Sequence, residues 1–322
     1  MSMRIILDTD TGVDDALAIL LAMRSPELTV EAITAVSGNV HVDHCVRNIL
    51  MTLELLELES IPAVARGEDG PLASAVTLAD NVHADDGLGG VSKLLLADGQ
   101  PRYSAPQNRL SPTHAVDLIL EIIERHPGEI TLIAVGPLTN VARAVINNPF
   151  RMQKLKQLIV MGGAFQVYGN VSPVAEFNIF ADPHAAQVVC GAGIPMVFVP
   201  LDVTMQAVLS APDIDLYAQQ GGKVARFVKD CTDHYVDFHR QRRNVDGCFI
   251  HDALAVAVAF QPELVTMVDA KINVETAGDL TSGMTVADLR PAFMPDEGPN
   301  GKVCTQVKAD TFISLFNERV LK

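Results

Sequence analysis

Four carboxylates lie within a short segment near the start of the chain, at Asp8, Asp10, Asp14 and Asp15. Carboxylates this close repel one another unless a positive charge binds them. Helix capping accounts for one or two of them, because acidic side chains are stabilised at the positive end of a helix dipole. Four acids are more than helix capping requires. Calcium and magnesium prefer oxygen ligands, which carboxylates supply. The cluster therefore predicts a site for a hard divalent cation.

The elements around this cluster place it at the end of a strand. The apolar run of residues 5–7 predicts a buried strand, Gly12 predicts a turn, and the apolar spacing of residues 13–23 predicts a helix. Open α/β sheets bind their ligands at the carboxyl ends of the strands. We expect one crevice to collect five residues that closely follow apolar runs: Asp10, Asn39, Val135, Gly163 and Asp202.

Strand-like and helix-like segments alternate along the first two-thirds of the chain. Strands are predicted over residues 29–36, 63–65, 130–135, 158–161 and 196–199. Helices are predicted after Asn39 through Leu56 and over 112–126, with a long loop over 66–108. This alternation indicates parallel βαβ units. Because no linker or repeat is visible, we predict one α/β domain over residues 1–322, with an open, mostly parallel, doubly wound sheet and a more strand-rich last sixty residues.

Composition excludes several classes of protein. The formal net charge of -15 argues against binding to nucleic acid, which needs clustered Lys and Arg. No apolar run is long enough to span a bilayer, and no signal segment opens the chain, so no membrane partner is expected. The five cysteines show no close pairing, which favours a reduced, cytoplasmic protein over a disulfide or zinc framework.

Several motifs together resemble those of the nucleoside hydrolases, the inosine–uridine-preferring N-ribohydrolase family. The segment Asp8–Asp15 is similar to that family's Asp-x-Asp-Pro-Gly-x-Asp-Asp signature, with Thr11 in place of the usual Pro. Further blocks agree in the same order along the chain: Gly-Pro-Leu-Thr-Asn at 136–140, Met-Gly-Gly at 161–163, Ala-Glu-Phe-Asn-Ile at 175–179 and His-Asp at 251–252. The match covers nearly the whole chain, and it implies the Rossmann-like nucleoside hydrolase fold, assembled as a homodimer or homotetramer.

The resemblance also implies a cofactor and a set of site residues. One calcium ion would be bound by the carboxylates of Asp10, Asp15 and Asp252 and by the backbone carbonyl of Val135, with Asp10 also serving as the base toward water. Contacts to the ribose would come from Asp14, Asn39, Met161, Asn170, Glu176, Asn178 and Asp252.

These residue types suit cleavage of a ribosyl C–N bond, which passes through a state resembling an oxocarbenium ion. A cation bound by carboxylates orients water, and calcium tolerates six to eight oxygen ligands, so the vicinal hydroxyls of a ribose can join its shell. A site built to hydrogen-bond hydroxyls strongly rejects a sugar that lacks one. The dense Asp, Asn and Glu pattern is therefore typical of a ribose site.

Four residues are candidates for the base end of the substrate. His251 would protonate the leaving base, since histidine titrates near neutral pH; the alternative is a structural histidine at a helix start. His83 would contact the nucleobase or the ribose 5′ end, or else be a solvent-exposed loop residue. A helix predicted over 230–243 would close over the base with Tyr235 and His239, while Arg242 and Arg243 could equally form a solvated basic face.

The absence of Trp bears on which base is accepted. Purine-restricted relatives lack the histidine that corresponds to His251 and stack the base between Trp rings. A chain that has His251 and no Trp is therefore expected in the pyrimidine-accepting or broad-specificity branch, with ribonucleosides such as uridine, cytidine and inosine as substrates.

Two other functions remain open from the sequence. In a haloacid-dehalogenase-like phosphatase, Asp8 would be the nucleophile and magnesium the cation, but no convincing downstream Lys is present. A non-catalytic nucleoside binder would have lost base or metal ligands, yet Asp10, Asp15 and Asp252 are all there. An EF-hand is excluded, because the twelfth loop position counted from Asp8 is Ile19 rather than Glu.

Overall fold

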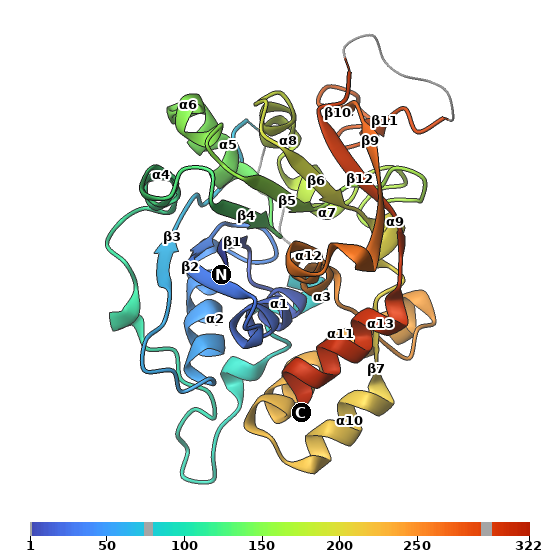
Figure 1. Ribbon diagram of the computed structural model, residues 1–322. Helices are drawn as coiled ribbons and strands as arrows, with labels where there is room; N and C mark the ends of the chain where they lie inside the picture. The colour runs from blue at the N-terminus through green and yellow to red at the C-terminus, as the bar shows by residue number, and fades with distance from the viewer. Residues whose placement is uncertain (1, 74–79, 291–297) are drawn as a thin grey trace.

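The computed structural model describes residues 2–73, 80–290 and 298–322. Within them a main sheet has eight strands in the order β3-β2-β1-β4-β5-β6-β12-β9, and neighbouring strands are parallel except β12 and β9 (Figure 1). The strands are β1 (Met3–Thr9), β2 (Leu28–Ala35), β3 (Ala63–Arg66), β4 (Ile130–Ala134), β5 (Gln157–Met161), β6 (Met196–Val199), β9 (Val265–Ala270) and β12 (Gly301–Val307). Two short antiparallel pairs stand apart: β7 (Val208–Ser210) with β8 (Gly247–Phe249), and β10 (Ile272–Val274) with β11 (Thr285–Ala287).

The strand order reverses between β1 and β4, and this reversal fixes the position of the crevice. From β1 the chain proceeds outward to β2 and β3, then returns to place β4 on the other side of β1. The connections on the two sides of such a point leave in opposite directions, so a gap opens beyond the carboxyl ends of these strands. The acidic segment that follows β1 is therefore carried to the mouth of this gap.

Buried side chains alternate between the two faces of the sheet, as the two-residue period of a strand requires. In β1, Ile5 and Leu7 join one apolar core and Ile6 joins the other; in β5, Ile159 and Leu158 divide in the same way. On the first face pack α1 (Val13–Arg24), α2 (Val42–Glu54), α11 (Lys223–Arg243), α12 (His251–Phe260) and α13 (Ala309–Phe316). On the second face, drawn above the sheet in Figure 1, lie α4 (Ala115–Arg125), α5 (Thr139–Asn147), α6 (Pro149–Met152) and α8 (Pro183–Cys190).

The four remaining α-helices of the described residues are short or peripheral: α3 (Asp80–His83), α7 (Phe177–Ala181), α9 (Leu201–Thr204) and α10 (Ala211–Gln220). No helix in the described part of the chain is both long and apolar enough to cross a membrane.

The predicted doubly wound, mostly parallel α/β sheet is confirmed, and most predicted elements end within a few residues of the observed ones. Two details differ. The helix expected from residue 230 begins at Lys223, because Gly222, in extended conformation, provides its N-cap. The segment 66–108, expected to be loop, contains α3 and a 3₁₀ turn (Val91–Lys93), and a second 3₁₀ turn (Gln107–Arg109) begins at its end. Residues 74–79 of this segment lie outside the described residues.

Candidate active site

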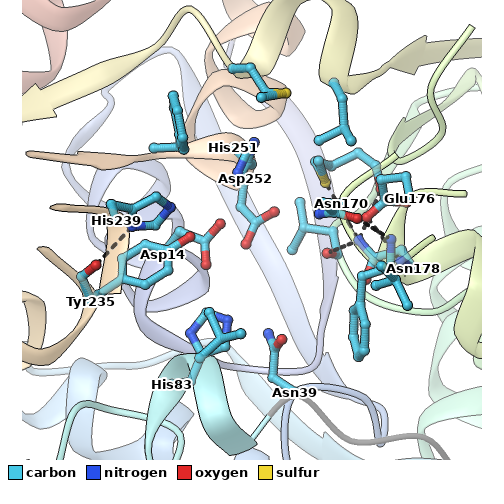
Figure 2. A pocket seen from close by; sticks show the side chains of 18 of the residues that line it. Asp14, Asn39, His83, Asn170, Glu176, Asn178, Tyr235, His239, His251 and Asp252 are labelled. Carbon is cyan, nitrogen blue, oxygen red and sulfur yellow. Dashed lines mark hydrogen bonds between the residues drawn. The ribbon is translucent and has the colours of Figure 1, made fainter. Parts of the chain in front are cut away.

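One cavity lies beyond the carboxyl ends of β1, β2, β4 and β5, and most of the predicted site residues line it. The structure brings twelve of them together: Asp14, Asn39, His83, Val135, Met161, Asn170, Glu176, Asn178, Tyr235, His239, His251 and Asp252. Figure 2 shows Tyr235 and His239 on the left, Asn170, Glu176 and Asn178 on the right, Asp14 and Asp252 between them, and His83 below. The other two, Asp10 and Asp15, are fully buried behind the lining.

Three carboxylates form a compact group at the base of the cavity. One oxygen each from Asp14, Asp15 and Asp252 lies within 4.8 Å of the others. Burial, followed by repulsion from Asp15, raises the pKa of Asp14 well above its usual range, and burial and Asp14 do the same for Asp252. Such a group binds a proton or a cation far more readily than it stays fully ionised.

Asp10 stands beside this group rather than within it. Its Oδ2 accepts the backbone N–H of Asn39 at 2.6 Å. Its Oδ1 is buried and receives no hydrogen bond from any described residue. Burial and then repulsion from Asp15 raise the pKa of Asp10 well above its usual range. A buried carboxylate oxygen with no donor is costly unless a proton or a cation contacts it.

Asp15 is the best supported of the acids. It accepts hydrogen bonds from the Thr9 hydroxyl (2.6 Å), the Gly12 backbone N–H (2.8 Å) and the Asn39 side-chain amide (3.0 Å). These contacts tie the start of α1 to the end of β1 and to the loop after β2. Burial nevertheless raises the pKa of Asp15. The site thus offers four carboxylates, and one buried carboxylate oxygen, Asp10 Oδ1, has no hydrogen bond from a described residue. Oxygen ligands of this kind fit a hard divalent cation.

The amide-rich side of the cavity is held by Glu176, which follows the loop after β5. Its carboxylate accepts backbone N–H groups from Gly163 (3.0 Å), Asn178 (2.9 Å) and Ile179 (3.3 Å), and burial raises its pKa to about 7. Asn178 donates from Nδ2 to the Val135 carbonyl at 2.7 Å. The end of β4 and the start of α7 are thereby locked together beside the acids.

Asn170 is more loosely placed on the same side. Its side chain is exposed, and Oδ1 accepts the backbone N–H of Phe177 at 2.9 Å, which fixes the loop that carries it. The amide nitrogen of Asn170 is left for a ligand or for solvent.

The opposite side of the cavity is formed by aromatic and imidazole rings. Tyr235 and His239 lie one turn apart on α11, so they share a face of that helix. The ring of His83 stacks on Tyr235 at 5.1 Å between centroids, and the ring of Phe249 lies 4.9 Å from His239. Burial lowers the pKa of His83 to about 3, so the ring is neutral and its Nδ1 accepts the Val13 N–H at 3.1 Å.

His251 lies at the start of α12, directly before Asp252, and is seen just above Asp252 in Figure 2. Its Nδ1 is 2.8 Å from the hydroxyl of Thr204 in α9, and its ring is 5.5 Å from that of Phe249. Burial, followed by the nearby His239, lowers the pKa of His251 to about 3. One ring nitrogen is thus anchored and the other is available to a ligand.

The structure corrects three expectations. Gly163 and Asp202 do not line the cavity: the Gly163 N–H binds Glu176, and the Asp202 carboxylate accepts the N–H groups of Phe165 and Gln166. His83 is buried, which removes the solvent-exposed alternative. Asp8 is fully buried and bonded to the side chains of Thr34 and Asn140, a position unsuited to a phosphatase nucleophile.

Sequence reasoning missed several lining residues. Arg243 lies two turns after Tyr235 on the same helix face and lines the cavity, so its helical spacing would have separated it from Arg242. The apolar lining residues Phe249, Leu201 and Met205 come from β8 and from the region of α9. Nothing in their local sequence distinguishes them from core residues.

Comparisons with known proteins agree with this geometry. The family model for the inosine-uridine preferring nucleoside hydrolases matches residues 5–314. The pyrimidine-specific ribonucleoside hydrolase RihA of Salmonella arizonae is 39% identical, with 99% of each chain covered. Among solved structures, the purine-preferring ribonucleoside hydrolase from Gardnerella vaginalis is 31% identical with a TM-score of 0.89, covering 98% of this chain and 97% of that one. The plant nucleoside hydrolase PpNRh1 is 32% identical with a TM-score of 0.89, covering 100% and 99%. This chain belongs to the inosine-uridine preferring nucleoside hydrolase family.

Proposed function

We propose that this ribonucleoside hydrolase uses calcium and cleaves pyrimidine ribonucleosides, or both pyrimidine and purine ribonucleosides, to ribose and free base. The observation that carries the proposal is the division of the cavity. One end has buried acids and amides, which suit ribose hydroxyls and a cation, and the other has rings and imidazole nitrogens, which suit a nucleobase. The two halves of a nucleoside require these two environments side by side.

The residues present fit a calcium ion. Asp10, Asp15 and Asp252 would hold it together with the Val135 carbonyl, and Asp14 lies close enough to take part. The unpaired Oδ1 of Asp10 supports this set, because a cation would satisfy it. When bound, calcium would lower the pKa of a water molecule and orient it and the ribose hydroxyls.

The side chains divide the remaining tasks. Asp10 would act as the base toward water, because a carboxylate that holds the ion lies next to the water molecule that the ion orients. The ribose would be held by the polar lining residues Asp14, Asn39, Asn170, Glu176, Asn178 and Asp252, with Met161 as an apolar contact. His251 would assist departure of the base.

The nucleobase would lie among His83, Tyr235 and His239. These rings offer aromatic and imidazole surface for a base to pack against in a chain that has no Trp. RihA of Salmonella arizonae is named pyrimidine-specific, whereas the Gardnerella vaginalis enzyme is named purine-preferring. The higher identity to RihA over the full length supports acceptance of pyrimidine ribonucleosides. The alternative is a broader substrate specificity that includes inosine.

We also propose that the chain works as a homodimer or homotetramer in the cytoplasm. Phe150 and Ile146 support self-association, since these apolar side chains lie on either side of the α5–α6 junction with exposed fractions of 79% and 54%. The five cysteines are free and buried, which supports a reducing compartment. Light scattering on the purified protein would give the oligomeric state.

Release of free ribose tests the proposed function directly. The purified enzyme is given uridine, cytidine, inosine or adenosine without added phosphate, before and after chelation and with calcium restored. Ribose from uridine or cytidine that disappears on chelation and returns with calcium is expected. Ribose release that survives chelation would refute the calcium requirement. Tight nucleoside binding without any ribose would favour the non-catalytic binder.

A further inference from the structure

Two histidines at the base end of the cavity are anchored through the same ring nitrogen but by different partners. His239 Nδ1 lies 2.8 Å from the Tyr235 backbone carbonyl, and His251 Nδ1 lies 2.8 Å from the Thr204 hydroxyl. A neutral imidazole has one N–H donor and one acceptor, so the partner of Nδ1 decides what Nε2 offers to a ligand. The two partners therefore place the proton on different ring nitrogens in the two histidines.

His239 is held as an acceptor toward the cavity. A carbonyl oxygen can only accept, so the proton of His239 must be on Nδ1 for the bond to the Tyr235 carbonyl (dashed in Figure 2). Nε2 of the neutral ring then carries a lone pair. His239 is therefore unable to donate a proton or a hydrogen bond to a departing base unless it gains a second proton.

Thr204 favours the reverse arrangement in His251. The Thr204 side chain is fully buried, and its hydroxyl has His251 Nδ1 as its one hydrogen-bond partner in the described part of the chain. If the hydroxyl donates to Nδ1, its proton is satisfied. If Nδ1–H donated instead, the hydroxyl proton would be buried without an acceptor, which is unfavourable. The proton of the neutral ring therefore belongs on Nε2.

We propose that Thr204 is a positioning residue that holds His251 with its proton on Nε2, facing the leaving nucleobase. This rests on the proposed function. When the C1′–N bond breaks, its electron pair goes to the base, and an N–H aimed at a base nitrogen or carbonyl oxygen stabilises that charge, as a neutral imidazole can. Thr204 lies at the end of α9, between the lining residues Leu201 and Met205, and touches the reaction only through the His251 ring.

Substrates with different leaving groups test this role. Uridine needs help to release its base, whereas p-nitrophenyl riboside releases a phenolate that needs no hydrogen-bond donor. Thr204→Val keeps the shape and removes the hydroxyl; it is expected to lower kcat on uridine about tenfold while kcat on p-nitrophenyl riboside stays within about twofold. Thr204→Ser retains the hydroxyl and should restore uridine turnover.

A double substitution shows whether Thr204 acts through His251. In a His251→Ala background, Thr204→Val should cause no further loss on uridine, because its target is gone. Thr52→Val is the matched control: Thr52 is also fully buried, and its hydroxyl donates to the Asn48 carbonyl in α2 at 2.8 Å. This control should leave the ratio of the two substrates unchanged.

Two results would overturn this inference and leave the proposed function intact. One is an equal loss on both substrates in Thr204→Val, which would indicate a general effect on the site. The other is a full additional loss in the His251→Ala background, which would separate Thr204 from His251. A wild-type enzyme that releases no ribose from uridine would refute the proposed function itself, and this inference with it.

Discussion

Gly38, in the loop after β2, leaves the space that Asp10 occupies. A Cβ added at Gly38 would lie 2.1 Å from Asp10 Oδ2 and 2.8 Å from its Cβ and Cγ. Non-bonded heavy atoms normally stay about 3.5 Å or more apart. Gly38→Ala must therefore displace the Asp10 carboxylate or the loop by roughly 1 Å, the difference between these separations.

The size of the effect follows from two independent considerations. The displacement disturbs the 2.6 Å hydrogen bond from the Asn39 N–H to Asp10 Oδ2, and bonds to charged groups contribute ~1.5–3 kcal/mol. A misplacement of about 1 Å in a catalytic group costs on the order of 100-fold in rate. Since a factor of 100 corresponds to about 2.7 kcal/mol, the two agree. We expect Gly38→Ala to lower kcat/KM for uridine about 100-fold.

The assay compares kcat/KM for ribose release with a matched glycine control. The control is Gly191→Ala. Gly191 caps the C-terminus of α8, away from the cavity, and a Cβ added there would meet backbone oxygens at 3.6 and 3.7 Å, which is ordinary contact. That variant should resemble wild type. Thermal unfolding shows whether each variant is folded. A folded Gly38→Ala enzyme with kcat/KM within threefold of wild type would refute the placement of Asp10 as a rigid catalytic group.

Three further predictions concern the acids, the ribose contacts and pH. Asp10→Asn should lower kcat by at least about a thousandfold while uridine still binds in calorimetry; near-normal turnover would show that Asp10 is not the base. Asn178→Ala should raise KM and lower kcat together, because ribose contacts strengthen in the transition state; a change in KM alone would contradict this. His83 has a folded-state pKa of about 3, below the value of ~6.5 in an unfolded chain, so its contribution to stability is complete above about pH 6.5 and is lost as pH falls toward 3. The free energy of unfolding of wild type should therefore fall relative to His83→Gln by about 1.4 kcal/mol per pH unit between pH 6 and 4, measured by denaturant titration; parallel curves would contradict a buried neutral His83.

The parts of the site that could be predicted from sequence are those where chemistry and local structure coincide. Asp10, Asp14 and Asp15 follow one strand, and Gly12 marks the turn between that strand and α1. A strand end, a turn and a helix start are local features, so the position of the acids could be deduced without knowing any tertiary contact.

The parts of the site that could not be predicted from sequence depend on contacts between distant segments. Thr204 meets His251 because α9 packs against α12, and no local pattern indicates that pairing. Asp202 follows a strand as Asp10 does, but its carboxylate turns to the backbone of Phe165 and Gln166. Position in the topology predicts which end of the sheet a side chain occupies, whereas packing decides which way it points.

The position of β12 in the sheet has a consequence for synthesis of the protein. The parallel strand β12 lies between β6 and β9, although both are made earlier. Until residues 301–307 leave the ribosome, the edge of β6 has unpaired backbone groups that can pair with another chain. At ~5–20 residues per second that interval lasts several seconds. The growing chain is therefore most exposed to edge-to-edge association after its cavity residues have been made and before β12 pairs with β6.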